Sequence, residues 1–522
     1  MKLYTATAMR EVDRIAIEEM GVPSLSLMEN AAQAVAGALA RTVPEKLAGR
    51  VVILCGKGNN GGDGMAVARL LAGMGYSPTA WLAVPPEVLS GDARVQFDSL
   101  GPAMVSWRSA AESPDELKDA LSTADLVVDA LLGTGLGGPV RAPYLELVRA
   151  VNESPAFVAA VDIPSGMAGD SLQPIGEAVR ANLTLTLALP KPCLYIREGA
   201  AFAGTVQVLD IGIPPEAAAR VEPVAEALDD AWARPFFGPR EAGTHKGKAG
   251  RVLLVAGSVG KSGAAALAAR GALRAGAGLV TVACPVSAQP VVAASLPEVM
   301  TIPLPETREG TVSMDALMPI LEACATADAV GMGPGLGDVP EALALCRELY
   351  RRITRPAVVD ADALNAFAGR ADELRDRGDA RILTPHPGEM GRLVGRTASE
   401  VVSKRFDLAP EKAEAWGTVV LLKGYRTLVA SAGRAWRLNL SGGPHMAGPG
   451  FGDVLTGVAA AILARGVEPF DAAALAAWWH GAAADAAYQA LGGYGLLASE
   501  CADGLPLVEG TLRAGAPHGP RP

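Results

Sequence analysis

The sequence has few of the residues that stabilise secreted proteins or hold proteins in membranes. Its 522 residues include six cysteines, with no C-x-x-C pair and no spacing typical of zinc ligands, which predicts reduced, buried thiols. It has no uninterrupted apolar run of about 20 residues that could span a bilayer. Its N-terminal segment is charged and helix-periodic where a signal peptide needs an apolar core. We therefore expect a soluble cytoplasmic protein without a membrane partner.

Basic residues are also scarce. The chain has 46 Lys and Arg against 56 Asp and Glu, and its net charge of -10 argues against electrostatic capture of nucleic acid or anionic membranes. Apolar residues are abundant: 50% of the chain is hydrophobic and 60 residues are glycine, which is typical of a compact α/β enzyme. The length predicts at least two domains. Small molecules are therefore the expected partners, and nucleic acid is not.

Apolar runs of strand length alternate with Ala- and Leu-rich stretches of helix length from residue 50 onward. In the first half of the chain the runs are VVILC, TAWLAV, LVVDALLG, FVAAVDIP, LTLTLAL and VQVLDIG. In the second half they are RVLLVAGS, LVTVACP, ADAVGMGPG, PAVVDADAL, ARILTPHPGE and TVVLLKG. This βαβ rhythm predicts parallel sheets with helices on both faces.

The rhythm is interrupted near 220–236 by a segment rich in Pro, Ala and acidic residues. We therefore expect two α/β domains in tandem, over residues 1–218 and 236–510, joined by a linker at 219–235. The two series of strands share no motif that would indicate a duplication. Residues 511–522 are expected to form a flexible tail.

The stretch GKGNNGGDG at 56–64 follows the first predicted strand and fits the G-x-G-x-x-G pattern of a dinucleotide-binding loop. A dehydrogenase also needs an acidic residue about 20 positions further on to hold the ribose. The next strand offers only Glu87, after two prolines. The pattern does not explain Asn59, Asn60 and Asp63. These residues suit tight turns, but their side chains are also hydrogen-bonding groups for a ligand.

Two further predicted strands end in polar residues. Asp129 is followed by a second Gly-rich loop, 133–139, whose backbone N–H groups could hold a phosphate. Asp162 and Ser165 follow the next strand, and ligands of open α/β sheets bind beyond the carboxyl ends of strands. Asn60, Asp129 and Ser165 would then offer oxygen ligands to a hard cation. Asp162 is left for acid–base chemistry.

The motifs NNGGDG, DALLGTG and DIPSG, with LMENAA at 27–32 and DIGIP at 210–214, resemble the NAD(P)H-hydrate epimerase domain over residues 1–218. The resemblance implies a Rossmann-like fold, a bound potassium ion, and interconversion of the R and S hydrates of NADH and NADPH (NADHX and NADPHX). It implies that Asp162 is the catalytic carboxylate. The implied potassium ligands are Asn60, Asp129 and Ser165. The implied contacts to the hydrate are Asn59, Asn60, Gly61, Gly62, Asp63, Gly133, Thr134, Gly135, Leu136, Gly137, Gly138, Pro139 and Asp162.

The stretch GKS at 260–262 resembles the end of a Walker A motif, but that motif needs glycine at position 255, where the chain has valine. A stronger signal is GPGFGD at 448–453, which precedes a helix pattern. Asp453 could be a base beside backbone N–H groups that bind an anion, or only an acidic residue in the first turn of a helix. Polar turns after other predicted strands favour ligand binding, and Lys423, after the run VVLL, would meet a phosphate.

The motifs HKG, AGSVGKSGAA, GPGLG, DADALN, TPHPGE, LLKG and GDVLTG resemble the ADP- or ATP-dependent NAD(P)H-hydrate dehydratase domain over residues 236–510. That family is related to the ribokinase-like kinases, so the resemblance implies a ribokinase-like α/β fold. It also implies that Asp453 is the base and that magnesium accompanies ADP or ATP. The implied hydrate contacts are Ala264, Gly335, His386 and Asp453. The implied nucleotide contacts are Lys423, Gly424, Tyr425, Arg426, Thr427 and Gly452.

One loop departs from the pattern of that family. Where the family usually has ATGGTGD, this chain has AGPGFGD at 447–453, and we expect Pro449 and Phe451 to stiffen and crowd the loop. The departure bears on loop geometry and on nucleotide preference.

Together the two resemblances imply a single repair reaction sequence. Asp453 would deprotonate the C6 hydroxyl of the S hydrate, the oxygen would attack the terminal phosphate of ADP, and departure of phosphate would leave NAD(P)H and AMP. The epimerase would supply the S hydrate from the R hydrate, and a homo-oligomer is expected. One alternative is a ribokinase-like small-molecule or vitamin kinase, which leaves the first half unexplained. Another is a cofactor-binding module with inactive sites, against which the intact Asp162 and Asp453 count.

Overall fold

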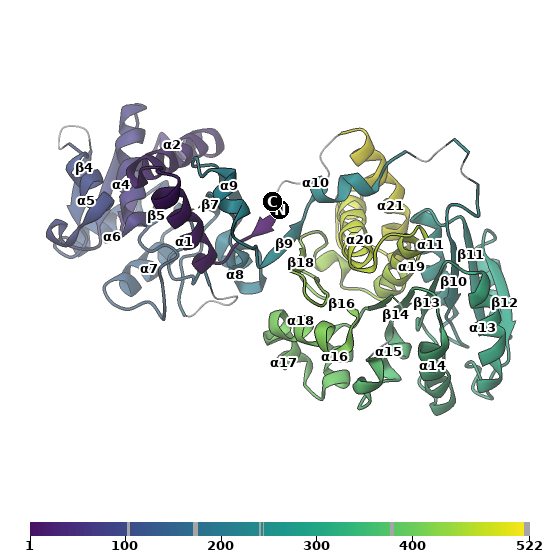
Figure 1. Cartoon of the computed structure of the whole chain (residues 1–522). Helices are drawn as coiled ribbons and strands as arrows, with labels where there is room; N and C mark the ends of the chain where they lie inside the picture. Colours follow the sequence, from purple (N-terminus) through teal and green to yellow (C-terminus); the bar gives the residue numbers. More distant parts are fainter. Residues whose placement is uncertain (102–104, 171–175, 240–241, 244, 376–379, 516–522) are drawn as a thin grey trace. The chain divides into compact units, whose positions relative to one another are not determined.

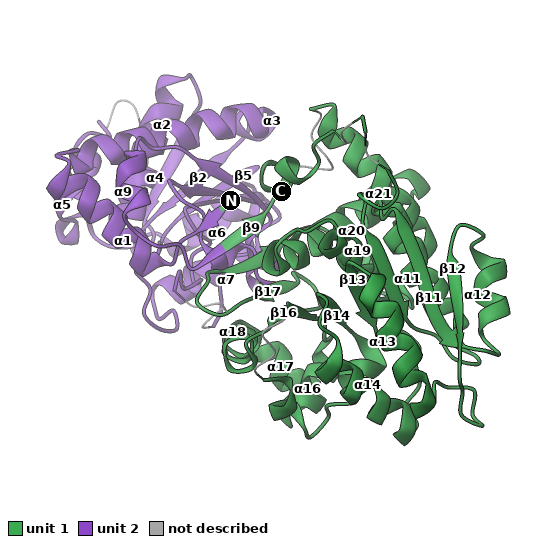
Figure 2. Cartoon of the chain, turned by 45° about the vertical axis from the view of Figure 1, so that its right-hand side comes forward, with its two compact units in different colours: residues 1, 226–521 green, residues 2–225, 522 purple. Residues whose placement is uncertain are grey.

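The computed structural model describes residues 1–101, 105–170, 176–239, 242–243, 245–375 and 380–515. They form two compact units, one of residues 2–225 and one that contains residues 226–521 (Figure 2). The division falls inside the segment expected to be a linker. That segment carries strand β9 (Ala225–Leu228) and helix α10 (Asp230–Ala233), because the strand buries its apolar side chains and Asp229 caps the helix.

The first unit is built on a parallel sheet of seven described strands in the order β4-β3-β2-β5-β6-β7-β8. The strands are β2 (Val51–Cys55), β3 (Pro78–Leu82), β4 (Ser106–Ser109), β5 (Leu126–Ala130), β6 (Phe157–Val161), β7 (Leu183–Leu187) and β8 (Thr205–Leu209). The chain runs from β2 to one edge of the sheet and from β5 to the other edge. The strand order therefore reverses between β2 and β5, and such a switch point is where open α/β sheets bind ligands.

Helices cover both faces of this sheet (Figure 1). They are α1 (Ala6–Arg14), α2 (Ser24–Thr42), α3 (Pro44–Leu47), α4 (Asn59–Gly73), α5 (Gly91–Asp98), α6 (Pro114–Ser122), α7 (Tyr144–Glu153), α8 (Arg197–Ala203) and α9 (Pro215–Ala219). Val52 and Leu54 of β2 face a core that contains residues of α6 and α7, and the alternate residues of β2 face a core with α2 and α4. This is the predicted Rossmann-like architecture.

The second unit contains a larger sheet with strands in the order β18-β17-β16-β15-β14-β13-β10-β11-β12. They are β10 (Arg251–Val255), β11 (Leu279–Pro285), β12 (Met300–Leu304), β13 (Ala329–Met332), β14 (Ala357–Val359), β15 (Arg381–Leu383), β16 (Val419–Leu422), β17 (Leu428–Ala430) and β18 (Trp436–Asn439). The strands are parallel up to β16, and β17 and β18 pair antiparallel at one end. Here the order reverses between β10 and β13.

Helices also flank the sheet of the second unit (Figure 1). They are α11 (Ser262–Arg274), α12 (Gln289–Ser295), α13 (Leu317–Thr326), α14 (Pro340–Arg352), α15 (Ala361–Asn365), α16 (Pro387–Val394), α17 (Ala398–Ser403), α18 (Arg405–Trp416), α19 (Phe451–Ala464), α20 (Pro469–Leu491) and α21 (Ala498–Arg513). Helices α11 and α19 touch closely, since a Cβ on Gly457 would lie 1.8 Å from the carbonyl oxygen of Ala268. The result is the expected ribokinase-like α/β unit.

The ends and the cysteines of the chain complete this description. Of the expected tail, residues 511–513 belong to α21 and 516–522 lie outside the described residues. All six cysteines are buried and form no disulfide. Among the described helices, each is too short or too polar to cross a bilayer.

Candidate active sites

The first unit has a cavity of about 540 Å³ beyond the ends of its central strands. Asn59, Asn60 and Asp63 line it from the first turns of α4, and residues 133–136 line it after β5. Asp162, which follows β6, completes the polar wall. The structure therefore brings together side chains from three different strand ends, as predicted. Five of the predicted hydrate contacts are not part of the lining: Gly61, Gly62, Gly137, Gly138 and Pro139.

The glycines of the first loop are required by the close approach of backbone atoms. A Cβ on Gly56 would lie 1.8 Å from the carbonyl oxygen of Leu131. A Cβ on Gly61 would lie 1.9 Å from the carbonyl oxygen of Gly56. The G-x-G-x-x-G spacing therefore shapes a turn that holds the start of α4 against the loop after β5.

Gly61→Ala is expected to destabilise the first unit by about 3 kcal/mol or more, because the new methyl group meets backbone that cannot rotate away. This would lower the temperature at which half of the epimerase activity is lost by roughly 6 °C or more. The matched control is Gly73→Ala at the other end of α4, where a Cβ would meet nothing within 4 Å. Equal heat resistance of the two variants would show that the close approach does not constrain this turn.

The predicted potassium ligands provide buried oxygen atoms. Ser165 donates a hydrogen bond from Oγ to Asp129 Oδ1 at 2.6 Å and from its backbone N to Asp129 Oδ2 at 2.8 Å, and both residues are fully buried. Burial raises the pKa of Asp129 to about 6, although the bonds from Ser165 oppose that shift. Asn60 is buried, and neither Oδ1 nor Nδ2 has a partner. An amide oxygen without a donor, close to the loop that Asp129 and Ser165 anchor, fits a large cation that prefers oxygen.

Asp162 forms an ion pair that the sequence did not predict. Lys191 is 1% exposed and donates from Nζ to Asp162 Oδ1 at 2.5 Å. It also donates to the carbonyl oxygen of Leu187 at 2.8 Å and to Thr186 Oγ1 at 3.3 Å. The backbone of Asp162 has a φ of 66°, a conformation that costs a non-glycine residue energy and that aims the side chain into the cavity wall. The carboxylate is therefore fixed by a buried cation and by its own backbone.

Three further carboxyl groups line the same cavity, those of Asp13, Asp63 and Asp92. Burial raises the pKa of Asp13, on α1, to about 6; Lys191 lowers it and Asp162 raises it further. Burial raises the pKa of Asp63 well above its ordinary value, and the charges of Asp162, Asp13 and Asp92 add to that shift. Asp13 and Lys191 were not predicted from the sequence. Lys191 lies between two prolines, four residues after the apolar end of β7.

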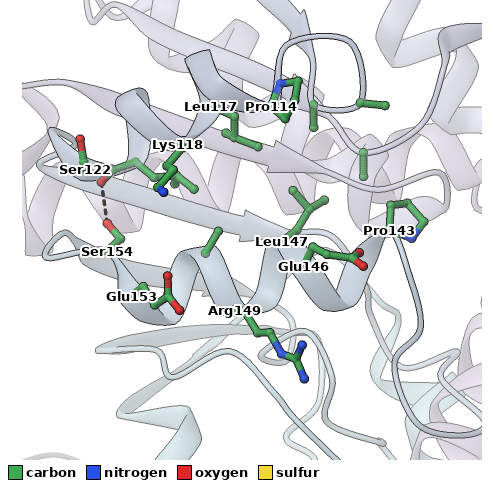
Figure 3. Close-up of a pocket in the computed structure, with 15 residues that line it drawn as sticks. Pro114, Leu117, Lys118, Ser122, Pro143, Glu146, Leu147, Arg149, Glu153 and Ser154 are labelled. Carbon is green, nitrogen blue, oxygen red and sulfur yellow. Dashed lines mark hydrogen bonds between the residues drawn. The ribbon is translucent and has the colours of Figure 1, made fainter.

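A separate cavity in the first unit, of about 530 Å³, contains none of the predicted site residues (Figure 3). It lies between α6 and α7, with Leu117 and Leu147 inside and Lys118, Glu146 and Arg149 around it. Its walls are mainly aliphatic and it lacks the clustered carboxylates of the first cavity.

The second unit has a cavity of about 490 Å³ beside the start of α19. All of the predicted nucleotide contacts line it: Lys423, Gly424, Tyr425, Arg426, Thr427 and Gly452. The buried Arg405 fixes the segment 423–427. It donates hydrogen bonds to the carbonyl oxygens of Tyr425 at 2.7 Å and of Arg426 at 2.9 Å. These bonds fix the carbonyl oxygens of the segment, and the backbone N–H of Lys423 donates to the carbonyl oxygen of Pro385 at 2.9 Å.

Asp453 lies in the first turn of α19, beside a group of buried charges. Burial raises the pKa of Asp453 to about 7, Asp360 adds to the shift, and Lys423 opposes it. Lys423 donates from Nζ to Asp360 Oδ1 at 2.6 Å and lies 3.7 Å from Glu389 Oε2. Burial works against the charge of Lys423, but these two carboxylates raise its pKa overall. A carboxyl group that titrates near neutral pH beside a buried ammonium is suited to general base catalysis.

The remaining predicted hydrate contacts lie on neighbouring turns of the second unit. Gly335 has a φ of +64°, and a Cβ there would lie 3.0 Å from the Cβ of Ala264. His386 caps α16: its Nδ1 accepts from the backbone N of Gly388 at 3.0 Å and of Glu389 at 3.2 Å. Burial and then the charge of Lys423 lower the pKa of His386, so the ring is neutral and its Nε2 carries the proton.

Phe451, one of the two residues of the 447–453 loop that differ from the family pattern, is buried. Its ring belongs to the hydrophobic core and meets the ring of His480 edge-on, with centroids 6.0 Å apart. It also forms part of the nucleotide cavity wall. Phe451 therefore both packs in the core and borders the cavity. Its packing fixes the start of α19, where Gly452 and Asp453 follow it in the chain.

Comparisons with known proteins match both halves of the chain. Residues 24–193 match the family model described as YjeF-related protein N-terminus, and residues 252–506 match that of NAD(P)H-hydrate dehydratase. The bifunctional NAD(P)H-hydrate repair enzyme Nnr of Moorella thermoacetica is 43% identical over 97% of this chain and 96% of its own length. That of Salinibacter ruber is 40% identical over 92% of this chain and 91% of its own length.

A solved structure is also similar to the second unit. It is the ADP/ATP-dependent NAD(P)H-hydrate dehydratase from Bacillus subtilis, co-crystallised with ATP and Mg²⁺, which is 30% identical, with a TM-score of 0.47, over 55% of this chain and 98% of that chain. The relatives match nearly the full length of the chain and both of its units. The chain belongs to the family of bifunctional NAD(P)H-hydrate repair enzymes.

Proposed function

We propose that the first unit interconverts R and S hydrates at the Asp162 cavity and that the second unit dehydrates the S hydrate at Asp453, with ADP as phosphate donor. The observation that carries this proposal is the presence, in each unit, of a cavity lined by a lysine that forms an ion pair with a carboxylate: Lys191 with Asp162 in the first unit and Lys423 with Asp360, beside Asp453, in the second. A vitamin kinase would need only the second of these sites.

In the first unit, Asp162 is the group that moves a proton as the C6 centre inverts. Lys191 orients its carboxylate, while Asn59, Asp63 and the 133–136 loop bind the hydrate. Asn60, Asp129 and Ser165 would hold potassium. When bound, that ion supplies positive charge that attracts the oxygen atoms of the substrate.

In the second unit, Asp453 removes the proton from the C6 hydroxyl, which is a poor leaving group until it is phosphorylated. The hydroxyl oxygen then attacks the terminal phosphate of ADP and AMP leaves. Lys423 and the N–H groups at the start of α19 stabilise the charge that develops on the phosphate. Loss of phosphate, assisted by the ring nitrogen, followed by loss of a proton from C5 to solvent, restores the C5–C6 double bond of NAD(P)H. Magnesium bound with the nucleotide would supply further positive charge at the phosphates; the Bacillus subtilis relative was co-crystallised with ATP and Mg²⁺.

The proposal is tested by incubating the full chain with a mixture of R and S NADHX and Mg²⁺, with ADP or ATP, while the absorbance of reduced nicotinamide is recorded. We expect complete recovery of NADH with ADP, because epimerisation feeds the R hydrate into the dehydratase. Recovery that stops when the S hydrate is exhausted would contradict epimerase activity. Recovery with ATP alone would contradict ADP as the donor.

A further inference from the structure

The ammonium group of Lys191 lies at the epimerase cavity. It has three hydrogen atoms, and the chain places an acceptor for each: Asp162 Oδ1, the carbonyl oxygen of Leu187 and Thr186 Oγ1. These hydrogen atoms are therefore engaged by the protein and not directed at the substrate. In the described part of the chain, the hydrogen bonds to the Asp162 carboxylate all reach Oδ1, which leaves Oδ2 to accept a proton.

A reaction that inverts a carbon bearing both a hydroxyl and a ring nitrogen needs a proton donor as well as a base. The C6 centre of the hydrate is a carbinolamine. Breaking the C6–N1 bond and reforming it on the other face inverts this centre, and N1 must take a proton for that bond to break. Asp162, whose Oδ2 is left to accept a proton, is placed as the base and not as the acid.

We propose that Asp13 is the second acid–base group of the epimerase site and donates the proton to N1. The inference rests on the proposed epimerase function. In the forward step, Asp162 takes the hydroxyl proton and the O–H electrons form the C6=O bond. The electron pair of the C6–N1 bond goes to N1, which takes a proton from Asp13. After rotation about C5–C6, N1 attacks the other face of the aldehyde and both protons return, so that no oxidant or reductant is needed.

The charges around Asp13 favour this assignment over the other carboxyl groups of the cavity. Asp13 lines the cavity together with Lys191 and Asp162, whose charges act on it in opposite directions, and Asp63 and Asp92 line the same cavity. The pKa of Asp13, about 6, lets it both give and take a proton near neutral pH. Asp63 is buried, and burial raises its pKa well above its ordinary value, which favours a hydrogen-bonding role for this group. Arg10, on the same helix, is already paired with Asp170 at 3.2 Å.

The test is the pH dependence of kcat/KM for conversion of R to S NADHX by the full chain, with the two epimers separated chromatographically and the spontaneous rate subtracted. An acid must be protonated to act, so the wild-type value should fall about tenfold per pH unit above the pKa of Asp13. Asp13→Asn should lower the value at pH 6 by about 10²-fold or more and abolish this fall. Asp13→Glu should restore it.

The control for a purely structural role is Asp170→Asn. Asp170 anchors the start of α1, accepting from the backbone N of Thr7 at 2.7 Å, but it is outside the cavity lining. This variant disturbs the same helix and should keep the alkaline fall. If Asp13→Asn retains that fall, Asp13 is not the acid. Absence of conversion by the wild type would instead contradict the proposed epimerase function itself.

Discussion

Asp453→Asn is expected to lower the rate of ADP-driven recovery of NADH from the S hydrate by about 10²–10⁴-fold, while interconversion of R and S hydrates continues. Asparagine has the same shape as aspartate but cannot take the hydroxyl proton. The Lys423 ammonium and the N–H groups of α19 would still bind the nucleotide, so the KM for ADP should change little. The measurement is kcat and KM with pure S hydrate, and unchanged kcat would exclude Asp453 as the base.

The pH dependence gives a second result for Asp453. The base must be ionised, so wild-type activity should rise with pH up to about 7 and the residual activity of the variant should not. The pKa of Asp453 is higher in the folded chain than in the unfolded chain, so ionisation of Asp453 destabilises the folded state. The free energy of unfolding therefore falls as pH rises toward 7. The variant has no charge to bury. It should therefore unfold at a temperature equal to or above that of the wild type at pH 8.

The control for Asp453 is Asp471→Asn. Asp471 is also an acidic residue in the first turn of a helix, α20, and it pairs with Arg437 at 2.5 Å. The charges that act on Lys423 include that of Asp453 and not that of Asp471. If first-turn aspartates mattered only through the helix dipole, the two variants would lose similar activity. We expect Asp471→Asn to retain it.

Asp162→Asn is expected to leave the R hydrate unrepaired, with a loss of about 10²–10⁴-fold in epimerisation. It should also lower the free energy of unfolding of the first unit by about 3–5 kcal/mol, because Lys191, 1% exposed, loses its counter-charge. Activity would be measured with R hydrate, and unfolding by denaturant titration of the full chain. Normal consumption of the R hydrate would remove Asp162 from the mechanism.

The double variant Asp162→Asn/Lys191→Met separates catalysis from stability. Removing both charges leaves neither member of this pair as an unpaired buried ion. Most of the lost free energy of unfolding should therefore return. Epimerisation should remain as low as in Asp162→Asn. If the double variant regains activity, the loss in the single variant came from misfolding and not from the missing base.

The sequence predicted those parts of the fold and the sites that are marked by local patterns. All of the apolar runs became strands, because buried strands of a parallel sheet are apolar on both faces. Strands β4 and β12 were missed because they lie at sheet edges and each buries only one side chain, which weakens the apolar signal; β17 and β18 were also missed. Of the predicted hydrate contacts, Asn59, Asn60, Asp63, residues 133–136 and Asp162 line the cavity, since strand ends of one sheet converge.

Asp13 and Lys191 could not be predicted in this way. Asp13 lies on an amphipathic helix whose neighbours are charged and exposed, so its position alone suggested a residue in solvent. Lys191 lies 29 residues after Asp162, in a loop without a distinctive spacing. Their roles depend on burial and on mutual charge, which only the folded chain defines. The buried Arg405 behind the 423–427 segment was missed for the same reason.

The described lining of each of the two cavities comes from a single unit, residues 9–211 in the first case and 423–481 in the second. Because both units belong to one chain, every unit that consumes the S hydrate is made together with one unit that replenishes it. The numbers of the two kinds of unit are therefore fixed at one to one, whatever the rate of each.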